Sequence, residues 1–306
     1  MPNPVVSVLM PAFNAEKYIA LAIDSILGQT FSDFELIIFN DGSTDRTGEI
    51  IHQFNDSRIV LIDSQENIGL VRARNTLVSK ARGRYIAFLD ADDIAVSDRL
   101  QIQTEFLGLD QVDICGGAYH SYYEVTGKMK ASKQRYTDAD IRALLTIASS
   151  LCNPTVMGKA AIFKKFPYRS GKNYAEDYSL WIEIALAGYR FANLKENLIT
   201  YRIHVKQTSQ TQSEETSAIF SQSRKGYLLG LGISSKLTPI AMPVASRLKI
   251  ALPFMLQLNQ KIPGISIMAN YEIYARFQYR GNGLLTPFTR LERLLVSAYA
   301  SLIGLA

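Results

Sequence analysis

Acidic side chains gather at one point of the chain in a way that calls for compensation. Asp90, Asp92 and Asp93 place three carboxylates within four positions, directly after a buried-strand pattern at residues 84–89. Carboxylates this close repel one another unless a cation or a ligand offsets their charge. Hard cations such as Mg²⁺ and Mn²⁺ prefer oxygen ligands and leave coordination positions for phosphate and water. The cluster therefore indicates a metal–diphosphate site, and a solvated acidic turn is the alternative.

Two further polar turns follow apolar runs. Residues 11–14 form a tight turn with exposed backbone groups, and residues 40–45 (NDGSTD) carry Asp41. The carboxylate of Asp41 is suited to accept a hydrogen bond from the N3 imide of uracil, which would select one base. The alternative for this turn is a helix N-cap supplied by Ser43 or Asp45. Neither Gly-x-Gly-x-x-Gly after a strand nor Gly-Lys-Ser/Thr occurs, which removes the main support for dinucleotide and P-loop sites.

An alternation of strands and helices must position these turns. Residues 5–10, 35–39, 58–62 and 84–89 are short, apolar and bounded by turn residues, so they predict buried strands. Helices are expected over residues 18–27, after a cap at Ser43 or Thr44, and over residues 68–80. The order predicts an α/β fold with a mostly parallel sheet flanked by helices. In such sheets ligands bind beyond the carboxyl ends of the strands, where the three turns stand.

Beyond residue 93 the regular alternation of predicted strands and helices ends. Helices are predicted over residues 97–109 and 174–188, strands over 112–118, 155–163 and 197–202, and a polar and then helical stretch over 128–150. Ser, Thr and Gln dominate residues 207–215, which indicates a linker. We therefore expect one domain over residues 1–210 and a mainly helical region over residues 211–306.

The helical region carries Lys and Arg among apolar residues. Pro253 interrupts the apolar run 250–258, and the charge-free tail 294–306 has 13 residues. Because a spanning helix needs about 20 apolar residues, neither predicts a transmembrane segment. Packing on the first domain or on a second copy in a homo-oligomer is the plain interpretation. Peripheral contact of a basic amphipathic surface with a membrane is the alternative.

The amino-acid composition excludes several classes of protein. The chain has 306 residues, 33 basic and 28 acidic side chains, 47% hydrophobic residues and two cysteines. These proportions exclude collagen-like, disulfide-scaffold and wholly disordered proteins. A net charge of +5 is no nucleic-acid signature, and it suits anionic ligands or lipid surfaces. Two cysteines, Cys115 and Cys152, in so long a chain indicate a reducing compartment, and no signal peptide is visible, so a cytoplasmic protein is expected.

Seven motifs in order now suggest a family. They are SVLMPAFN (7–14), NDGSTD (40–45), NIGLVRARN (67–75), YIAFLDADD (85–93), NPTV (153–156), EDYSLW (176–181) and YRIH (201–204). Together they resemble the family-2 inverting glycosyltransferases of the GT-A fold, over about residues 5–210. Residues 215–306 carry no such motif. The resemblance implies a nucleoside-diphosphate sugar donor, most often UDP-linked, and a divalent Mn²⁺ or Mg²⁺.

The resemblance also implies roles in the donor site. Pro11, Ala12 and Asn14 would line the nucleotide, and Asp41 matches the residue that reads the base. Many members have Asp where this chain has Asn40, which is a departure at the base contact.

The remaining donor-side assignments follow in the same way. Asp90, with Ala91 beside it, would contact the ribose or the sugar, and Asp92 would bind the metal. Arg74 matches a motif arginine near the nucleotide, with a surface helix cation as the alternative. Arg202 would help neutralise the leaving diphosphate, and His204 would complete the metal site or be structural.

The acidic pair Glu176 and Asp177 near the start of the predicted helix 174–188 completes the set of candidate site residues. In the family the aspartate of this pair is the catalytic base, which corresponds to Asp177, and Glu176 would orient it. Inversion requires that the acceptor hydroxyl lose its proton as it attacks the anomeric carbon opposite the leaving diphosphate. Complementation of a helix dipole is the alternative for both residues.

The expected activity is metal-dependent transfer of a hexose or N-acetylhexosamine from a UDP-sugar to a hydroxyl of a glycan or glycolipid, in cell-envelope polysaccharide synthesis. A non-catalytic nucleotide-sugar-binding or scaffold protein of the same fold is the alternative. A nucleotidyltransferase is disfavoured, because residues 11–14 stand where its glycine-rich phosphate loop would be. Acceptor specificity is expected in loops such as residues 128–136.

Overall fold

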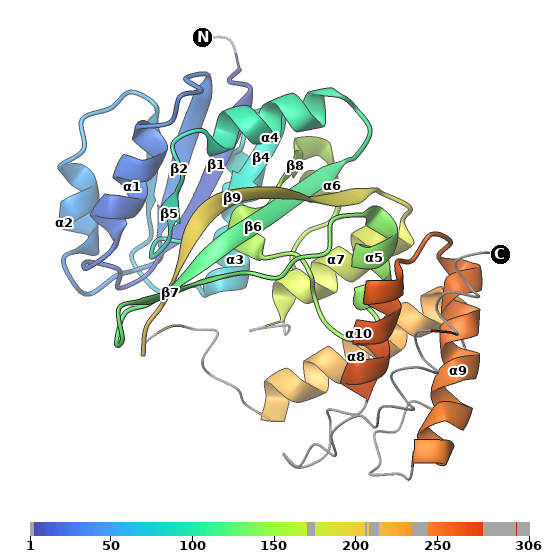
Figure 1. The fold of residues 1–306 in the computed structure, drawn as a ribbon. Helices are drawn as coiled ribbons and strands as arrows, with labels where there is room; N and C mark the ends of the chain where they lie inside the picture. The colour runs from blue at the N-terminus through green and yellow to red at the C-terminus, as the bar shows by residue number, and fades with distance from the viewer. Residues whose placement is uncertain are drawn as a thin grey trace.

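The computed structural model describes residues 3–169, 175–205, 207, 214–233, 244–277 and 298. Within these residues nine strands form one sheet, in the order β3-β2-β1-β4-β8-β6-β9-β5 with β7 paired to β6 (Figure 1). The strands are β1 (Val6–Ala12), β2 (Phe34–Asn40), β3 (Ile59–Asp63), β4 (Tyr85–Phe88), β5 (Ile94–Ala95), β6 (Ile114–Tyr123), β7 (Lys128–Ala131), β8 (Met157–Lys159) and β9 (Phe191–Ile203).

Strand direction brings several carboxyl ends to one edge of the sheet. β1 pairs in parallel with β2 and β4, β2 with β3, and β6 with β9. β8 is antiparallel to both β4 and β6, so these two strands run in the same direction. The predicted α/β architecture with a mostly parallel sheet is therefore confirmed, and the turns after β1, β2 and β4 share an edge with the ends of β6 and β9.

Helices cover both faces of the sheet, because successive residues of a strand point to opposite sides. Val8 and Met10 of β1 pack in one apolar cluster with α1 and α4, whereas Leu9 packs in another with α3, α6 and α7. The helices of this part are α1 (Ile19–Leu27), α2 (Thr47–His52), α3 (Leu70–Lys80), α4 (Arg99–Gly108), α5 (Asp138–Leu144), α6 (Ala160–Lys165) and α7 (Glu176–Leu186).

The predicted strand over residues 155–163 is confirmed only for β8 (Met157–Lys159), and helical segments lie on either side of it. A 3₁₀ turn, η1 (Asn153–Thr155), precedes β8, and α6 begins directly after it. Pro154 suits the first turn of such a helix, and Ile162 and Phe163 are buried on α6. A short apolar run of this kind fits a buried strand and a buried helix turn equally well, so its periodicity misled the prediction.

Strand β1 is longer than predicted. It continues through Pro11 and Ala12, so of the residues expected in the first turn only Phe13 and Asn14 lie beyond the strand. Pairing with β4 stops at Leu9, which faces Phe88, while pairing with β2 continues to Ala12. Beyond Leu9 the strand has a free side where the missing N–H of a proline is tolerated.

The C-terminal part is helical, as predicted, with α8 (Glu214–Gly230), α9 (Val244–Lys261) and α10 (Ile267–Phe277). Its apolar cluster includes Phe254, Met255 and Tyr274 and reaches Leu144 of α5, so these helices pack against the sheet domain (Figure 1). Pro253, which interrupts the apolar run 250–258, lies inside α9, and the helix continues through it. Burial of the two following residues in this cluster offsets the hydrogen bond that a proline removes.

Two predictions here concern segments only partly described. The end of the expected linker 207–215 is helical, because α8 begins at Glu214, and residues 208–213 lie outside the described residues. The tail 294–306 also lies outside them, apart from Ala298. Among the described helices, none combines the length and the apolar character needed to cross a membrane. Cys115 and Cys152 are free thiols.

Candidate active site

The turns after β1 and β2 are joined by hydrogen bonds. The backbone N–H of Asn14 donates to Ser43 Oγ (3.0 Å), and that of Thr44 donates to Asn14 Oδ1 (2.9 Å). Asp45 Oδ1 accepts from the N–H of Thr47, the first residue of α2, at 2.9 Å. The predicted cap at Ser43 or Thr44 is therefore wrong: Asp45 satisfies the helix start while those two bind the neighbouring turn.

Asp41 is buried and organises the entry to α3. Its carboxylate accepts hydrogen bonds from the N–H groups of Ile68 (2.7 Å) and Gly69 (3.0 Å). The next residue, Gly42, has φ +64°, and a Cβ there would lie 2.5 Å from the carbonyl carbon of Glu66. Only glycine fits this approach. The structure thus places Asp41 at the strand edge with its oxygens directed to the loop before α3.

The departure at Asn40 has a local explanation. Its Nδ2 donates to Asp63 Oδ1 at 2.9 Å, at the end of the neighbouring strand β3. An aspartate at position 40 would place a second carboxylate against Asp63 and repel it. The amide therefore suits this pair of strand ends.

The acidic turn after β4 is tied to the end of β9. Asp93 is fully buried and its Oδ1 accepts from the N–H of Arg202 (2.9 Å). Arg202 Nε donates to the carbonyl of Asp92 (3.0 Å), and the Asp92 carboxylate lies 2.9 Å from His204 Nε2. The three contacts bring together residues that the sequence motifs placed more than a hundred positions apart.

Negative charge in this turn is only partly balanced. Burial, followed by the charge of Asp90, raises the pKa of Asp92, and burial with the charges of Asp92 and Asp90 holds the pKa of Asp93 well above its usual range. Behind them Arg99 is fully buried, and burial lowers its pKa to about 10. Within the described part of the chain, Asp93 Oδ2 and Arg99 Nη1 are buried without a hydrogen-bond partner.

Arg74 links three elements in the interior. Its guanidinium donates to Glu176 at the start of α7 and to Asp90 Oδ1 (3.3 Å), and its side chain is 6% exposed. It also lies over the ring of Tyr168, 5.5 Å from the centroid. Burial lowers the pKa of Arg74, but the charges of Glu176 and Asp90 outweigh it and raise that pKa above its usual value. The surface-cation alternative for Arg74 is thereby excluded.

Asp177 has the electrostatics of a proton acceptor. It is partly buried, and its Oδ1 accepts from the N–H of Tyr178 at 2.6 Å. Burial and then the charge of Glu176 raise its pKa to about 7, with Arg74 opposing them. A carboxyl that titrates near neutrality can take a proton from a hydroxyl and give it up again.

The site holds residues that sequence reasoning missed. The ring of Tyr18 lies 4.7 Å from that of His204 and faces the guanidinium of Arg202 at 4.9 Å, and its hydroxyl donates to Glu124 (2.9 Å). In the sequence Tyr18 belongs to an amphipathic helix pattern and resembles any other apolar-face residue. Arg99 was likewise hidden within a helix pattern. The backbone of Pro11, Ala12 and Ala91 lies at the same strand ends.

Two of the predicted metal ligands, Asp92 and His204, lie side by side. No set of three or more His, Cys, Asp or Glu side chains is placed to hold a metal among the described residues. Asp92 Oδ2 and His204 Nε2 are hydrogen-bonded to each other at 2.9 Å, so an ion would have to replace this contact to bind both. Because Mg²⁺ and Mn²⁺ are commonly held by one or two side chains and completed by substrate phosphates and water, the pair suits an ion that arrives with a diphosphate.

Comparison with known proteins yields a consistent set of matches. The family model described as Glycosyl transferase family 2 matches residues 7–170. An Escherichia coli protein named UDP-Glc:alpha-D-GlcNAc-diphosphoundecaprenol beta-1,3-glucosyltransferase WfaP is 31% identical over 217 residues, 69% of this chain and 82% of that protein. An uncharacterized glycosyltransferase of Methanocaldococcus jannaschii is 34% identical over 209 residues, 66% of this chain and 72% of its own length.

Solved structures share the fold. Staphylococcus aureus TarS 1–349 in complex with UDP-GlcNAc aligns with a TM-score of 0.61 at 16% identity, over 98% of this chain and 90% of TarS 1–349. The mannosyltransferase PcManGT from Pyrobaculum calidifontis, in complex with GDP-Man and Mn²⁺, aligns with a TM-score of 0.57 at 16% identity, over 100% and 88% of the two chains. These alignments confirm the predicted fold class.

Proposed function

We propose the following reaction for this chain, which belongs to glycosyl transferase family 2 and is a glycosyltransferase. It moves a hexose or N-acetylhexosamine from a UDP-sugar to a hydroxyl of a lipid-linked glycan, with inversion and with a divalent cation. The observation that carries the proposal is Asp177, a carboxyl with a pKa of about 7 at the same sheet edge as a surplus of acidic groups. A binding or scaffold protein has no use for such a carboxyl.

Asp177 accepts the proton of the acceptor hydroxyl as that oxygen attacks the anomeric carbon. A base works best when its pKa lies near the working pH, and about 7 meets that condition. Glu176 and Arg74 hold the start of α7 by their buried ion pair, which fixes the direction of Asp177. Arg74 is thus a positioning residue for the base as well as a neighbour of Asp90.

The donor lies along the strand ends. Asn14 and Asp41 border the nucleotide beside the backbone of Pro11 and Ala12, and Asp90 with Ala91 faces the ribose or the sugar. The list of proposed nucleotide-sugar residues is therefore Pro11, Ala12, Asn14, Asp41, Arg74, Asp90, Ala91 and Arg202. Asp92 and His204 would hold Mn²⁺ or Mg²⁺, which neutralises charge on the diphosphate. The guanidinium of Arg202, held by the Asp92 carbonyl, adds positive charge on the same side.

The acceptor class is taken from the relatives. Two Escherichia coli proteins, WfaP and WfgD, are named as glucosyltransferases from UDP-Glc to α-D-GlcNAc-diphosphoundecaprenol. We therefore propose a sugar linked through a diphosphate to a lipid as the acceptor. A peripheral position at the membrane, through the C-terminal helices, would suit such a substrate.

The test uses the full chain and a water-dispersible acceptor, N-acetylglucosamine α-diphosphate on a short alkyl chain. A thermal-shift series of UDP- and GDP-sugars, with and without Mn²⁺, identifies the donor, because a ligand at about 100 times its Kd stabilises the fold by about 2.7 kcal/mol. The donor that binds is then incubated with the acceptor and free UDP is measured. We expect UDP release that stops with excess EDTA and returns with Mn²⁺.

Two results would contradict the proposal. Binding of a nucleotide sugar with no release of UDP beside any lipid-linked acceptor would favour the scaffold alternative. Transfer that is unaffected by EDTA would remove the metal from the reaction. Asp92→Asn, which keeps the volume of the side chain, serves as the internal comparison, since we expect it to raise the Mn²⁺ concentration needed for half-maximal rate.

A further inference from the structure

A pocket of about 260 Å³ lies among β6, β9, the segment after α5 and α10. Its walls come from Tyr119 of β6, Tyr201 of β9, the segment 148–152 after α5, and residues 133–135 after β7. Glu272 of α10 closes one side, so the C-terminal helices contribute directly to the pocket. The turns proposed to hold the donor, residues 11–14 and 40–45, are not among its lining residues.

Two contacts connect the pocket wall to the proposed base. Cys152 lines the pocket, and the next residue, Asn153, accepts a hydrogen bond from the hydroxyl of Tyr168 (3.3 Å). The ring of Tyr168 lies against the guanidinium of Arg74, which contacts Glu176 and Asp90. Tyr178, the neighbour of Asp177, donates its hydroxyl to the carbonyl of Leu145, in the segment that leads into the pocket wall. A molecule in the pocket would thus contact a wall that is connected to the base, and it would lie outside the donor turns.

The lining has the chemistry of a sugar site. The rings of Tyr119 and Tyr201, 5.6 Å apart between centroids, offer apolar faces and hydroxyl groups. Charged side chains of Lys133, Arg135 and Glu272 line the same pocket. Aromatic faces combined with a few polar groups suit a ligand rich in hydroxyl groups.

A charged pair spans the pocket wall. Arg135 Nη2 lies 2.8 Å from Glu272 Oε2, and the two side chains keep 22% and 23% of their surface exposed. This ion pair joins the loop after β7 to α10, far away in the sequence. A carboxylate accepts from sugar hydroxyls and a guanidinium donates to them, so the pair can recognise the pattern of hydroxyl groups on a ring.

We propose that this pocket binds the terminal sugar of the acceptor, and that Arg135 and Glu272 are specificity-determining residues for it. The inference rests on the proposed function and adds a site to it. Ligand pockets for drug-sized molecules measure about 300–1,000 Å³, so a pocket slightly below that range suits one sugar ring. The C-terminal third of the chain then takes part in choosing the substrate through α10.

Two variants and one matched control test the pocket. Ala148→Trp fills it with a bulky ring, and Glu272→Gln keeps the shape of the side chain but removes its charge. Glu183→Gln is the control, because Glu183 is also paired with an arginine, Arg169, at 2.9 Å, with 27% of its side chain exposed, but does not line the pocket. Calorimetry measures binding of the short-chain N-acetylglucosamine diphosphate without donor, and steady-state kinetics give the KM of each substrate.

We expect Ala148→Trp to abolish binding of this acceptor and Glu272→Gln to raise its KM about tenfold or more. The Kd of the UDP-sugar, measured by calorimetry without acceptor, should stay within about twofold of the wild type in both variants, and Glu183→Gln should match the wild type. A purely structural role of Glu272 would instead lower the melting temperature with unchanged acceptor KM, and that result overturns the proposal.

Different results would contradict the proposed acceptor pocket and the proposed transfer reaction. Equal acceptor binding by the wild type and Ala148→Trp, or no binding by the wild type at millimolar acceptor, overturns the pocket and leaves transfer chemistry standing. Acceptor binding that Ala148→Trp removes, in a protein that never releases UDP, supports the pocket and contradicts the proposed function.

Discussion

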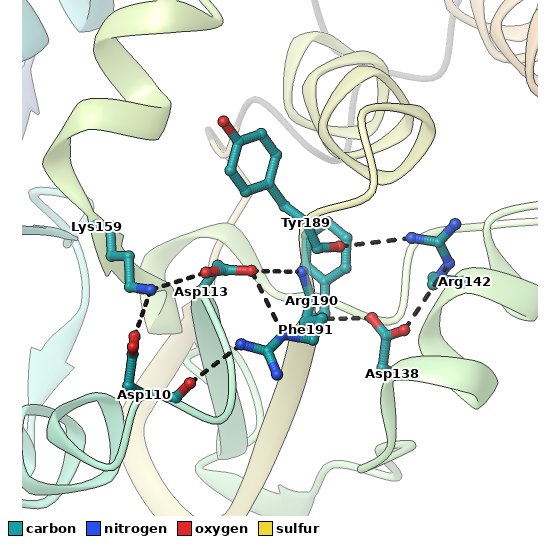
Figure 2. A network of polar contacts seen from close by, with 8 residues as sticks. All are labelled: Asp110, Asp113, Asp138, Arg142, Lys159, Tyr189, Arg190 and Phe191. Atoms are coloured by element: carbon teal, nitrogen blue, oxygen red, sulfur yellow. Dashed lines mark hydrogen bonds and ion pairs between the residues drawn. The ribbon is translucent and has the colours of Figure 1, made fainter.

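The two ends of the parallel strands both carry clustered carboxylates, but the carboxylates differ in how far basic side chains balance their charge. At the edge where β6 and β9 begin, Lys159 Nζ lies 2.6 Å from Asp110 and 2.9 Å from Asp113, and the N–H of Arg190 donates to Asp113 at 2.9 Å (Figure 2). At the other edge stand the carboxylates of the acidic turn and of α7. At the first edge Asp110 and Asp113 each contact a basic side chain. At the second edge Arg74 and His204 are shared among five carboxylates, Asp90, Asp92, Asp93, Glu176 and Asp177.

The pKa values of Asp110 and Asp113 record this difference, although burial raises the pKa of Asp138 near the same edge. The hydrogen bond from Lys159 lowers the pKa of Asp110, and at Asp113 the hydrogen bonds from Arg190 and Lys159 outweigh burial and lower the pKa as well. Burial and like charges raise the pKa of Asp92, Asp93 and Asp177. Residue type alone therefore does not mark a reactive site. Uncompensated charge at the carboxyl ends of strands does, because it is costly until a ligand or cation arrives.

The largest effect on the difference between the two edges should come from removing the charge of Asp177, the proposed base. Asp177→Asn should lower kcat by about 10²–10⁴-fold, the usual contribution of a positioned general base. Binding of the UDP-sugar, followed by thermal shift, should be unchanged. Near wild-type transfer by this variant would remove Asp177 from the reaction.

The next largest effect should come from removing the positive charge of Arg74, which contacts both Asp90 and Glu176. Arg74→Met leaves Glu176 buried without its partner, and loss of one member of a buried pair typically costs about 3–5 kcal/mol. Urea denaturation should show this loss in the free energy of unfolding. The double variant Arg74→Met with Glu176→Gln should recover much of it, and a loss below about 1 kcal/mol in the single variant would show that the pair contributes little.

The pH dependence of transfer and of stability tests the raised pKa of Asp177 directly. Because Asp177 must be ionised to accept a proton and its pKa is raised to about 7, kcat/KM should fall about tenfold for each pH unit below that value and level off above it. The same raised pKa means that the folded state holds this proton more tightly than the unfolded state, so its contribution to stability is lost as the pH rises through about 7. Asp177→Asn should lack that decline in urea denaturation, and a parallel decline in both proteins would contradict it.

The smallest effect belongs to the balanced edge. Lys159 keeps 31% of its side chain exposed, and such partly solvated pairs contribute about 0–1 kcal/mol. Lys159→Met should therefore change the unfolding free energy by no more than about 1 kcal/mol and leave transfer kinetics intact. A larger loss of activity than in Arg74→Met would mean that the two edges are coupled.

Local patterns in the sequence predicted the first half of the fold closely. β2 is buried at all seven positions, so a continuous apolar run marked it, and the amphipathic period marked α1. The acidic turn was visible because three carboxylates stand directly after such a run. Each of these signals lies within one segment of the chain.

Contacts between distant segments left no such signal. Asp93 holds the N–H of Arg202, and Arg135 meets Glu272, but none of the four residues has a neighbour in sequence that indicates its partner. The strand predicted over residues 155–163 was too long for a different reason, since an apolar stretch of that length fits both a strand and a helix, and only residues 157–159 form a strand. Tyr18 precedes α1 and His204 follows β9, so no local pattern near Tyr18 indicates their contact.

The hydrogen bonds between the first two turns have a consequence for protein engineering. Backbone groups of Asn14, Glu16, Thr44 and Arg46 each bond to a side chain of the opposite turn. A chimera that exchanges only one of these turns with a relative would leave several donors without acceptors. Residues 13–47 should therefore be exchanged as one block in chimeras with relatives.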